Sequence, residues 1–188
     1  MVEGQTGYLA LGSNQGNRLE HLRAAVTGLD RDARVSVQAV SSVYETEAHT
    51  DDPDEEQPAF LNAVVEVEVG CSPIDLLELA QSLEREEGRD RSRNERWAPR
   101  PLDVDLLVVG GITCHGERLT LPHPRLADRA FVLRPWTDLA PNLHVPPPFD
   151  ASVRALLDAC PDTHAIRRTV HDLTVPSRDD GEHRDEQV

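Results

Sequence analysis

Arginine is concentrated in one short stretch of this chain, directly before a pair of carboxylates. Six of the nineteen basic residues fall within sixteen positions, and these are Arg85, Arg89, Arg91, Arg93, Arg96 and Arg100. The stretch leads into Asp103 and Asp105, although the chain as a whole carries a formal net charge of -15 at pH 7. A guanidinium group offers a planar fork of donors to phosphate oxygens, and neighbouring carboxylates suit Mg²⁺. The combination predicts a site for a nucleoside triphosphate and its metal ions.

The two aspartates belong to the segment Leu102-Asp103-Val104-Asp105-Leu106. Side chains alternate along a strand, so both carboxylates point to one face. An isolated pair with this spacing is more often the solvated face of a strand than a metal site. Here the apolar run from Leu106 to Val109 indicates a largely buried strand, where two carboxylates repel each other unless a cation lies between them. That context favours a Mg²⁺ site.

The arginine-rich stretch has a simpler interpretation as a solvated loop. Arg85 fits it, because adjacent glutamates can pair with it. The later arginines fit it less well, since Pro99 and Pro101 stiffen the segment and Trp97 lies among the charges. Tryptophan commonly serves either to cover a planar ligand or to anchor a loop on the core, and both interpretations of Trp97 remain open.

Two other polar residues are candidates for ligand binding. Asn62 lies between apolar Leu61 and Ala63 on an expected strand, where a buried amide needs hydrogen-bond partners. A heterocycle with donors and acceptors along one edge would supply them. His123, between two prolines, could donate to a phosphate, although a lone histidine is more often structural.

The periodicity of apolar residues predicts an α+β chain. Helical spacing follows a candidate N-cap at Asn17 and recurs after Ser72, where a proline stands at the first helical position. The expected order is strand, helix, strand, strand, helix, strand, with ranges 8–11, 17–30, 35–44, 60–69, 72–88 and 102–109. This is the ferredoxin-like β-α-β-β-α-β arrangement, with a mainly antiparallel sheet and long catalytic loops. Both helices should cover one face and leave the other free for ligands or loops.

We expect one domain over residues 1–162. Within it, residues 47–58 form an acidic loop, 118–121 a further strand, 141–148 a proline-rich connector and 152–159 a short helix. Residues 163–188 are polar and lack an apolar stripe, so they are expected to form a disordered tail.

Composition narrows the classes of protein that fit. With 38% hydrophobic and 28% charged residues, the chain is of the ordinary globular type, and no apolar run marks a secretory signal or a membrane span. We therefore expect a cytoplasmic protein without membrane contact. A monomer is a separate expectation, which does not follow from the composition. The three cysteines have no metal-ligand spacing and are expected to be reduced. The acidity argues against a nucleic-acid partner.

Several motifs occur together in an order typical of one family. They are Ala10-Leu11-Gly12-Ser13-Asn14, Phe60-Leu61-Asn62-Ala63, Glu95-Arg96-Trp97-Ala98-Pro99-Arg100-Pro101-Leu102-Asp103-Val104-Asp105, Leu121-Pro122-His123 and Arg129-Ala130-Phe131. With these motifs the chain, from Tyr8 to about Leu143, resembles the 6-hydroxymethyl-7,8-dihydropterin pyrophosphokinases of folate biosynthesis. The resemblance implies transfer of the β,γ-pyrophosphoryl group of ATP to the hydroxymethyl oxygen of the pterin, with release of AMP.

The resemblance also implies roles for individual residues. Asp103 and Asp105 match the ligands of two Mg²⁺ ions, and Arg89 and Arg100 match catalytic arginines. The ATP-binding positions are Glu84, Arg96, Leu106, Thr120, His123 and Arg129. The pterin-binding positions are Thr46, Phe60, Asn62, Trp97 and Phe131. Either Arg91 or Arg93 takes an intermediate phosphate position.

Three other functions are weighed against this one. An RNA-binding module shares the fold class, but it predicts exposed aromatic residues and a basic face, and the chain has few aromatics and the opposite charge. Another Mg²⁺-dependent kinase or nucleotidyltransferase would differ in the phosphate attacked, and its nucleotide product would reveal it. A pterin-binding descendant without activity is disfavoured by the retained arginines and aspartates.

Overall fold

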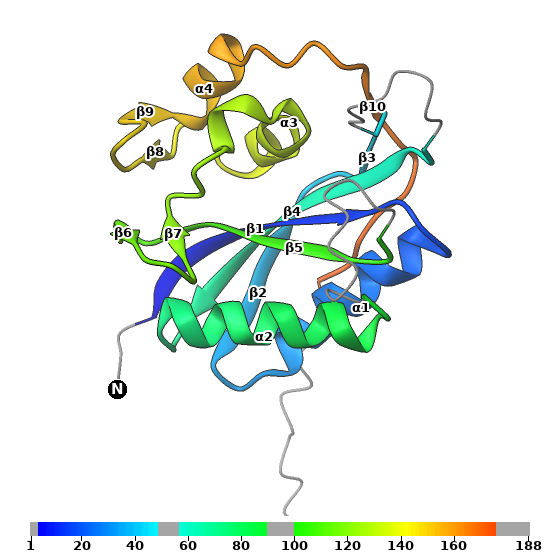
Figure 1. Ribbon diagram of the computed structural model, residues 1–188, viewed down its shortest axis with the longest axis horizontal. Helices are drawn as coiled ribbons and strands as arrows, with labels where there is room; N and C mark the ends of the chain where they lie inside the picture. The colour runs from blue at the N-terminus through cyan, green and yellow to red at the C-terminus, as the bar shows by residue number, and fades with distance from the viewer. Residues whose placement is uncertain (1–3, 49–56, 90–99, 176–188) are drawn as a thin grey trace, which may run out of the picture.

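The computed structural model describes residues 4–48, 57–89 and 100–175 (Figure 1). The main elements follow the expected order, with small additions after the last core strand. The elements are β1 (Gln5–Ser13), α1 (Arg18–Arg31), β2 (Val35–Val40), β3 (Tyr44–Thr46), β4 (Phe60–Val69), α2 (Pro73–Glu86), β5 (Asp103–Val109), β6 (Cys114–His115), β7 (Thr120–Leu121), the 3₁₀ helix η1 (Leu126–Asp128), α3 (Ala130–Leu139), β8 (His144–Val145), β9 (Ala151–Ser152), α4 (Val153–Ala159) and β10 (Ile166–Arg168).

One sheet forms the centre of the molecule. Its strands run in the order β10-β3-β4-β1-β5, and β2 also pairs with β4. Each of these pairings is antiparallel. The long strand β1 lies between β4 and β5, so a residue of β1 has neighbours on both sides. The predicted α+β fold with a ferredoxin-like core is confirmed.

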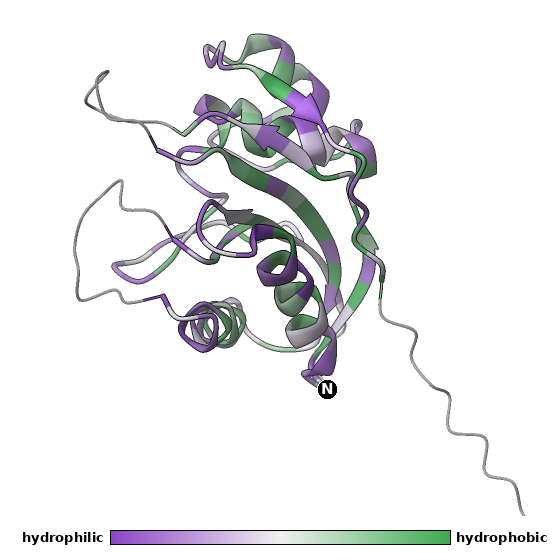
Figure 2. Cartoon of the chain, turned by 90° about the vertical axis from the view of Figure 1, so that its right-hand side faces the viewer, coloured by the Kyte–Doolittle hydropathy of each residue, from purple (hydrophilic) through white to green (hydrophobic). Residues whose placement is uncertain are grey.

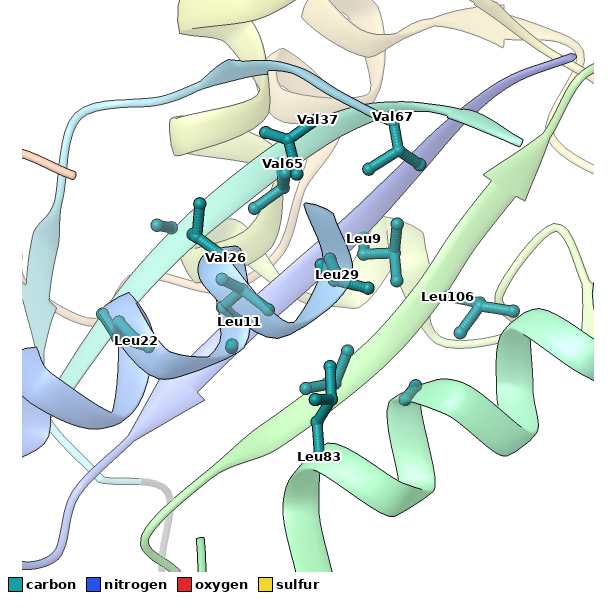
Figure 3. Packing of buried hydrophobic residues seen from close by; sticks show 14 of the residues in the cluster. Leu9, Leu11, Leu22, Val26, Leu29, Val37, Val65, Val67, Leu83 and Leu106 are labelled. Atoms are coloured by element: carbon teal, nitrogen blue, oxygen red, sulfur yellow. The ribbon is translucent and has the colours of Figure 1, made fainter. Parts of the chain in front are cut away.

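Helices α1 and α2 cover one face of this sheet, as predicted. Figure 3 shows Leu22, Val26 and Leu29 of α1 packed against the strands, with Leu83 reaching in from α2. The α2 helix starts where the sequence predicts: the Ser72 hydroxyl accepts a hydrogen bond from the Asp75 N–H at 3.2 Å, and the Asp75 carboxylate accepts one from the Ser72 N–H. This reciprocal cap fixes the first turn.

The opposite face is not left free, which corrects the expectation. Helices α3 and α4 lie over it, so the sheet is enclosed between two helical layers (Figures 1 and 2). Fully buried Trp136 of α3 packs on Tyr8 of β1, with ring centroids 5.3 Å apart. The sequence did not reveal α3, because Pro135 lies within it. Proline normally disfavours a helix interior.

The predicted strand 35–44 is divided into β2 and β3 at Ser41. The Ser41 N–H donates to the Val64 carbonyl at 2.9 Å, and the Ser41 hydroxyl accepts from the Val64 N–H at 2.9 Å. A side chain therefore takes the place of the backbone acceptor that a continuous strand would provide. The ladder to β4 is kept while the chain turns.

The chain remains structured beyond residue 162, which differs from the predicted boundary of the domain. Residues 166–168 form β10, and Leu173 is buried in the core beside α1 and α2. The expectation of a disordered tail from residue 163 is therefore wrong for residues 163–175. These residues carry no apolar repeat of their own, so periodicity did not predict a structure for them. The strand β10 is held instead by its pairing with β3.

All three cysteines are free thiols and half-buried, as expected for reduced packing residues. Within the described parts of the chain, every helix is too short or too polar to cross a bilayer.

Candidate active site

Three residues on adjacent strands form the base of the site. Gly12 of β1 lies opposite Asn62 of β4 on one side and opposite Asp103 of β5 on the other. A Cβ placed on Gly12 would lie 3.2 Å from the Asn62 Oδ1 and 3.9 Å from the Asp103 Cβ. The missing side chain therefore leaves space between an amide and a carboxylate.

A cavity of about 170 Å³ opens above this base. Its walls bring together predicted residues from β3, β4, β5 and the start of α3. The predicted residues that line it are Thr46, Phe60, Asn62, Arg100, Asp103, Asp105, Arg129 and Phe131. Residues separated by up to 85 positions thus meet at one site, with aromatic and amide groups beside arginines and carboxylates.

Each of the two aspartates is paired with arginine. The Arg100 Nη1 lies 3.0 Å from the Asp103 Oδ2, and Arg89 contacts the other oxygen of that carboxylate. The Arg129 Nη1 lies 2.6 Å from the Asp105 Oδ2. Burial acts to raise the pKa of Asp103, but the charges of Arg89 and Arg100 outweigh it and hold that pKa below its usual value. The Asp103 carboxylate is therefore ionised at neutral pH.

Glu84 supports this arrangement from behind the strand. Its carboxylate is fully buried, and its Oε1 accepts a hydrogen bond from the Val104 N–H at 3.0 Å. The same oxygen contacts Arg89, which therefore bridges Glu84 and Asp103. Burial acts to lower the pKa of Arg89, yet the two carboxylates raise it above its usual value. The Arg89 guanidinium is therefore charged at neutral pH, and its two carboxylate partners fix its orientation.

His123 lies at the edge of the aspartate pair. Its Nε2 is 3.9 Å from the Asp105 Oδ2, and its backbone N–H donates to the Leu107 carbonyl at 2.9 Å. Burial is the main reason that the pKa of His123 falls below its usual value, so the ring is neutral at pH 7. The Arg125 N–H lies 3.2 Å from the His123 Nδ1, which must then accept. The proton consequently resides on Nε2, the nitrogen that faces Asp105.

The other end of the cavity has aromatic walls and a fixed amide. The Asn62 Nδ2 donates to the Thr46 Oγ1 at 2.8 Å, which turns the Asn62 Oδ1 toward Gly12. Phe60 and Phe131 line the cavity, and the Arg129 guanidinium lies 5.6 Å from the centre of the Phe131 ring. A flat ligand with a hydrogen-bonding edge fits such a surface.

Some predicted site residues do not line the cavity. Leu106 is buried in the core on the side of α1 and α2 (Figure 3). Thr120 lies on the short strand β7. Glu84 contacts Arg89 rather than the cavity. Arg91, Arg93, Arg96 and Trp97 lie outside the described residues.

Asn14 is a structural residue of the site that sequence reasoning did not single out. Its Oδ1 accepts from the Arg100 N–H at 2.8 Å, its own N–H donates to the Arg100 carbonyl at 3.2 Å, and its Nδ2 donates to the Pro58 carbonyl at 3.3 Å. One buried side chain thus joins the segments that precede Asp103 and Phe60. Its position directly after Gly12 and Ser13 is the signal that was available. Gly12 and Arg125 were likewise not assigned a role.

The aspartate pair is chemically suited to Mg²⁺. Both carboxylates face the cavity, and oxygen is the ligand that this cation prefers. Among the described residues, no cluster of three or more histidine, cysteine or acidic side chains could enclose a metal. Mg²⁺ is commonly held by one or two carboxylates together with water and substrate phosphates, so the pair is sufficient as the protein's share.

Comparison with known proteins identifies relatives of the chain. A family model described as 7,8-dihydro-6-hydroxymethylpterin-pyrophosphokinase matches residues 8–141. A 2-amino-4-hydroxy-6-hydroxymethyldihydropteridine pyrophosphokinase of Bacillus subtilis is 45% identical over 134 residues, which cover 70% of this chain and 76% of the relative. The protein of the same name from Pseudomonas aeruginosa is 39% identical over 159 residues, with 84% and 93% covered.

A solved structure supports the fold independently. The crystal structure of wild-type HPPK-DHPS of Plasmodium falciparum matches with a TM-score of 0.64 at 15% identity. The match covers 84% of this chain and 45% of that longer one. At this identity the similarity concerns the fold alone.

Proposed function

The chain belongs to the 7,8-dihydro-6-hydroxymethylpterin-pyrophosphokinase family, and we propose that the cavity above Gly12 is where it carries out the reaction of that family. The reaction transfers the β,γ-pyrophosphoryl group of ATP to the hydroxymethyl oxygen of the pterin in folate synthesis. A bond forms between this oxygen and the β-phosphorus, and the bond from that phosphorus to the α,β-bridging oxygen breaks. AMP leaves with the bridging oxygen, and the hydroxyl proton passes to solvent.

The observation that carries the proposal is the alignment of Asn62, Gly12 and Asp103 across three strands. Adjacent strands are about 4.8 Å apart, so the backbones of Asn62 and Asp103 are separated by roughly 10 Å. A bicyclic pterin placed over Gly12 would meet Asn62 at its edge, with Phe60 and Phe131 available to stack on its faces. Its hydroxymethyl group would then point toward the aspartates and arginines.

We assign the phosphate end of the cavity to Arg89, Arg100 and Arg129. Phosphoryl transfer requires alignment and charge stabilisation more than a protein nucleophile, and arginine supplies both. Each of these arginines pairs with an aspartate in the structure, so each is held close to where phosphate oxygens would lie. The neutral His123, with its proton on Nε2, is placed to donate a hydrogen bond to a phosphate oxygen.

Asp103 and Asp105 are the residues that would hold Mg²⁺, and we propose two ions shared with the triphosphate. Bound Mg²⁺ would neutralise charge on the phosphates and polarise the phosphorus that is attacked. The family resemblance supports the number two, and the two carboxylates facing one cavity are consistent with it.

Identification of the nucleotide product tests this function. The purified protein is incubated with ATP, Mg²⁺ and 6-hydroxymethyl-7,8-dihydropterin, and the nucleotides are separated by chromatography. We expect AMP that depends on the pterin. We also expect Asp103→Asn to lose AMP formation by about a hundredfold or more, while Asp158→Asn, at an exposed position on α4, keeps it. ADP would indicate a simple kinase, pyrophosphate a nucleotidyltransferase, and either product would refute the proposal.

A further inference from the structure

The chain segment that follows α4 contacts the sheet edge next to the proposed pterin end of the cavity. In β10, Ile166 lies opposite Thr46 and Arg167 opposite Glu45. Thr169 extends the attachment, because its N–H and its hydroxyl both donate to the Val43 carbonyl, at 2.9 and 3.0 Å. This segment lies beyond residues 8–141, which the family model matches. Its contacts therefore lie outside the region that the family model covers.

Glu45 receives two arginines from different parts of the chain. Arg167 of β10 donates to its Oε2, and the Nη2 of Arg18, the first residue of α1, donates to its Oε1 at 3.0 Å. The hydrogen bond from Arg167 is the main reason that the pKa of Glu45 lies below its usual value. Both carboxylate oxygens are thus engaged, and α1, β3 and β10 are tied to one group.

Arg18 extends this connection to β4. Its Nη1 donates to the Ala59 carbonyl at 2.6 Å. Ala59 directly precedes Phe60, and Glu45 directly precedes Thr46, while Thr46 and Phe60 pair in register. One guanidinium therefore binds the residue before each of two cavity residues. Thr46 in turn accepts the hydrogen bond that orients Asn62.

We propose that Arg18, Glu45 and Arg167 form a positioning network for the pterin end of the cavity, with the C-terminal strand β10 as its outer support. The three residues do not line the cavity, so they act through Thr46, Phe60 and Asn62. The inference rests on the proposed function, because it assigns Phe60 and Asn62 to the pterin. The phosphate end is held by separate contacts, among them those of Glu84 and Arg89.

This separation gives the network a measurable signature. A contact that merely stabilises the fold would, when removed, weaken binding of both substrates or of neither. A network that positions Phe60 and Asn62 should affect pterin binding selectively. Substitutions that act at a distance through packed contacts typically change affinity severalfold, so we expect Arg18→Ala to weaken pterin binding about fivefold to tenfold.

The experiment compares full-length variants by calorimetric titration. Binding of 6-hydroxymethyl-7,8-dihydropterin is measured in the presence of a non-hydrolysable ATP analogue and Mg²⁺, and binding of the analogue is measured alone. The matched control is Arg23→Ala, which removes an arginine from the exposed side of the same helix, where it pairs with Glu20. We expect Arg18→Ala to weaken pterin binding with nucleotide binding unchanged, and Arg23→Ala to resemble the wild type.

Two further variants make the result decisive. Glu45→Gln should reproduce the selective loss, and Arg167→Ala, at a side chain that is 78% exposed, provides the test if Arg18→Ala does not fold. Pterin affinity equal to that of the wild type in Arg18→Ala or Arg167→Ala would overturn the network. A parallel loss of nucleotide affinity would also overturn it, since the contacts would then be merely structural. Wild-type protein that forms no AMP would instead refute the proposed function itself.

Discussion

The buried carboxylate of Glu84 offers a quantitative test of how the phosphate end is supported. Glu84 has two roles: it pairs with Arg89 and it accepts the Val104 N–H at 3.0 Å. Its side chain is 1% exposed and that of Arg89 is 17% exposed, so water cannot easily replace either contact. Removing one partner of a buried ion pair costs about 3–5 kcal/mol, and we expect this loss in the unfolding free energy of Glu84→Leu.

A second substitution separates the two roles. Glu84→Gln loses the charge but keeps an oxygen that can accept from the Val104 N–H. This hydrogen bond should make the glutamine variant about 1–2 kcal/mol more stable to unfolding than the leucine variant. Urea denaturation measures the free energy of unfolding of both variants, and an unchanged m-value shows that the change is one of stability. The control is Glu78→Gln on the same helix, which removes an exposed pair with Arg118 and should change stability by less than about 1 kcal/mol. If Glu84→Gln matched this control, or if leucine were no worse than glutamine, the reasoning would be refuted.

Three more outcomes follow from the site and the core. Gly12→Ala should weaken pterin binding severalfold in a titration while the fold is kept, because the new methyl group would lie 3.2 Å from the Asn62 Oδ1 inside the cavity; unchanged affinity would place the pterin elsewhere. Asn14→Ala should lower turnover and the unfolding free energy, the latter by about 2 kcal/mol, since two side-chain hydrogen bonds at a buried position are lost; AMP assays and urea denaturation check both. Tyr8 and Tyr44 are buried and donate to carboxylates, so both phenol pKa values are raised, chiefly by burial. Because the folded-state pKa of each tyrosine exceeds the unfolded value near 10, the contribution of these residues to stability is fully present below pH 10 and is lost as the pH rises further. Ultraviolet titration should then show tyrosinate only as the protein unfolds, and native-state ionisation near pH 10 would contradict this.

Local signals account for the parts of the fold that could be predicted. The start of α2 is predicted by Ser72, Pro73 and Asp75, which act within one turn, and β5 is predicted by an apolar run. The alternation of a strand also placed Asp103 and Asp105 on one face, as the structure confirms. These features depend on neighbours in the sequence, so sequence alone was sufficient.

The features that could not be predicted depend on distant partners. The strand β10 exists because Ile166 and Arg167 meet β3, more than a hundred residues earlier. The division at Ser41 depends on Val64, and the role of Asn14 depends on two segments that approach it only in the fold. In the site, the pairing of Arg129 with Asp105 follows from the position of α3, which has no clear sequence signal. The family motifs supplied Arg129 and Asp105 where periodicity could not.

The position of β10 at the outer edge of the sheet has a consequence for association between molecules. Without it, β3 would present unpaired backbone groups to solvent, and such edges invite pairing with strands of other chains. β10 is three residues long, and Arg167 and Arg168 are both exposed on it. Such a short edge is a poor template for a further strand, and the charge of Arg168 adds to this, because a second copy would bring the same charge alongside. The residues that complete the sheet thus also protect the protein from edge-to-edge aggregation.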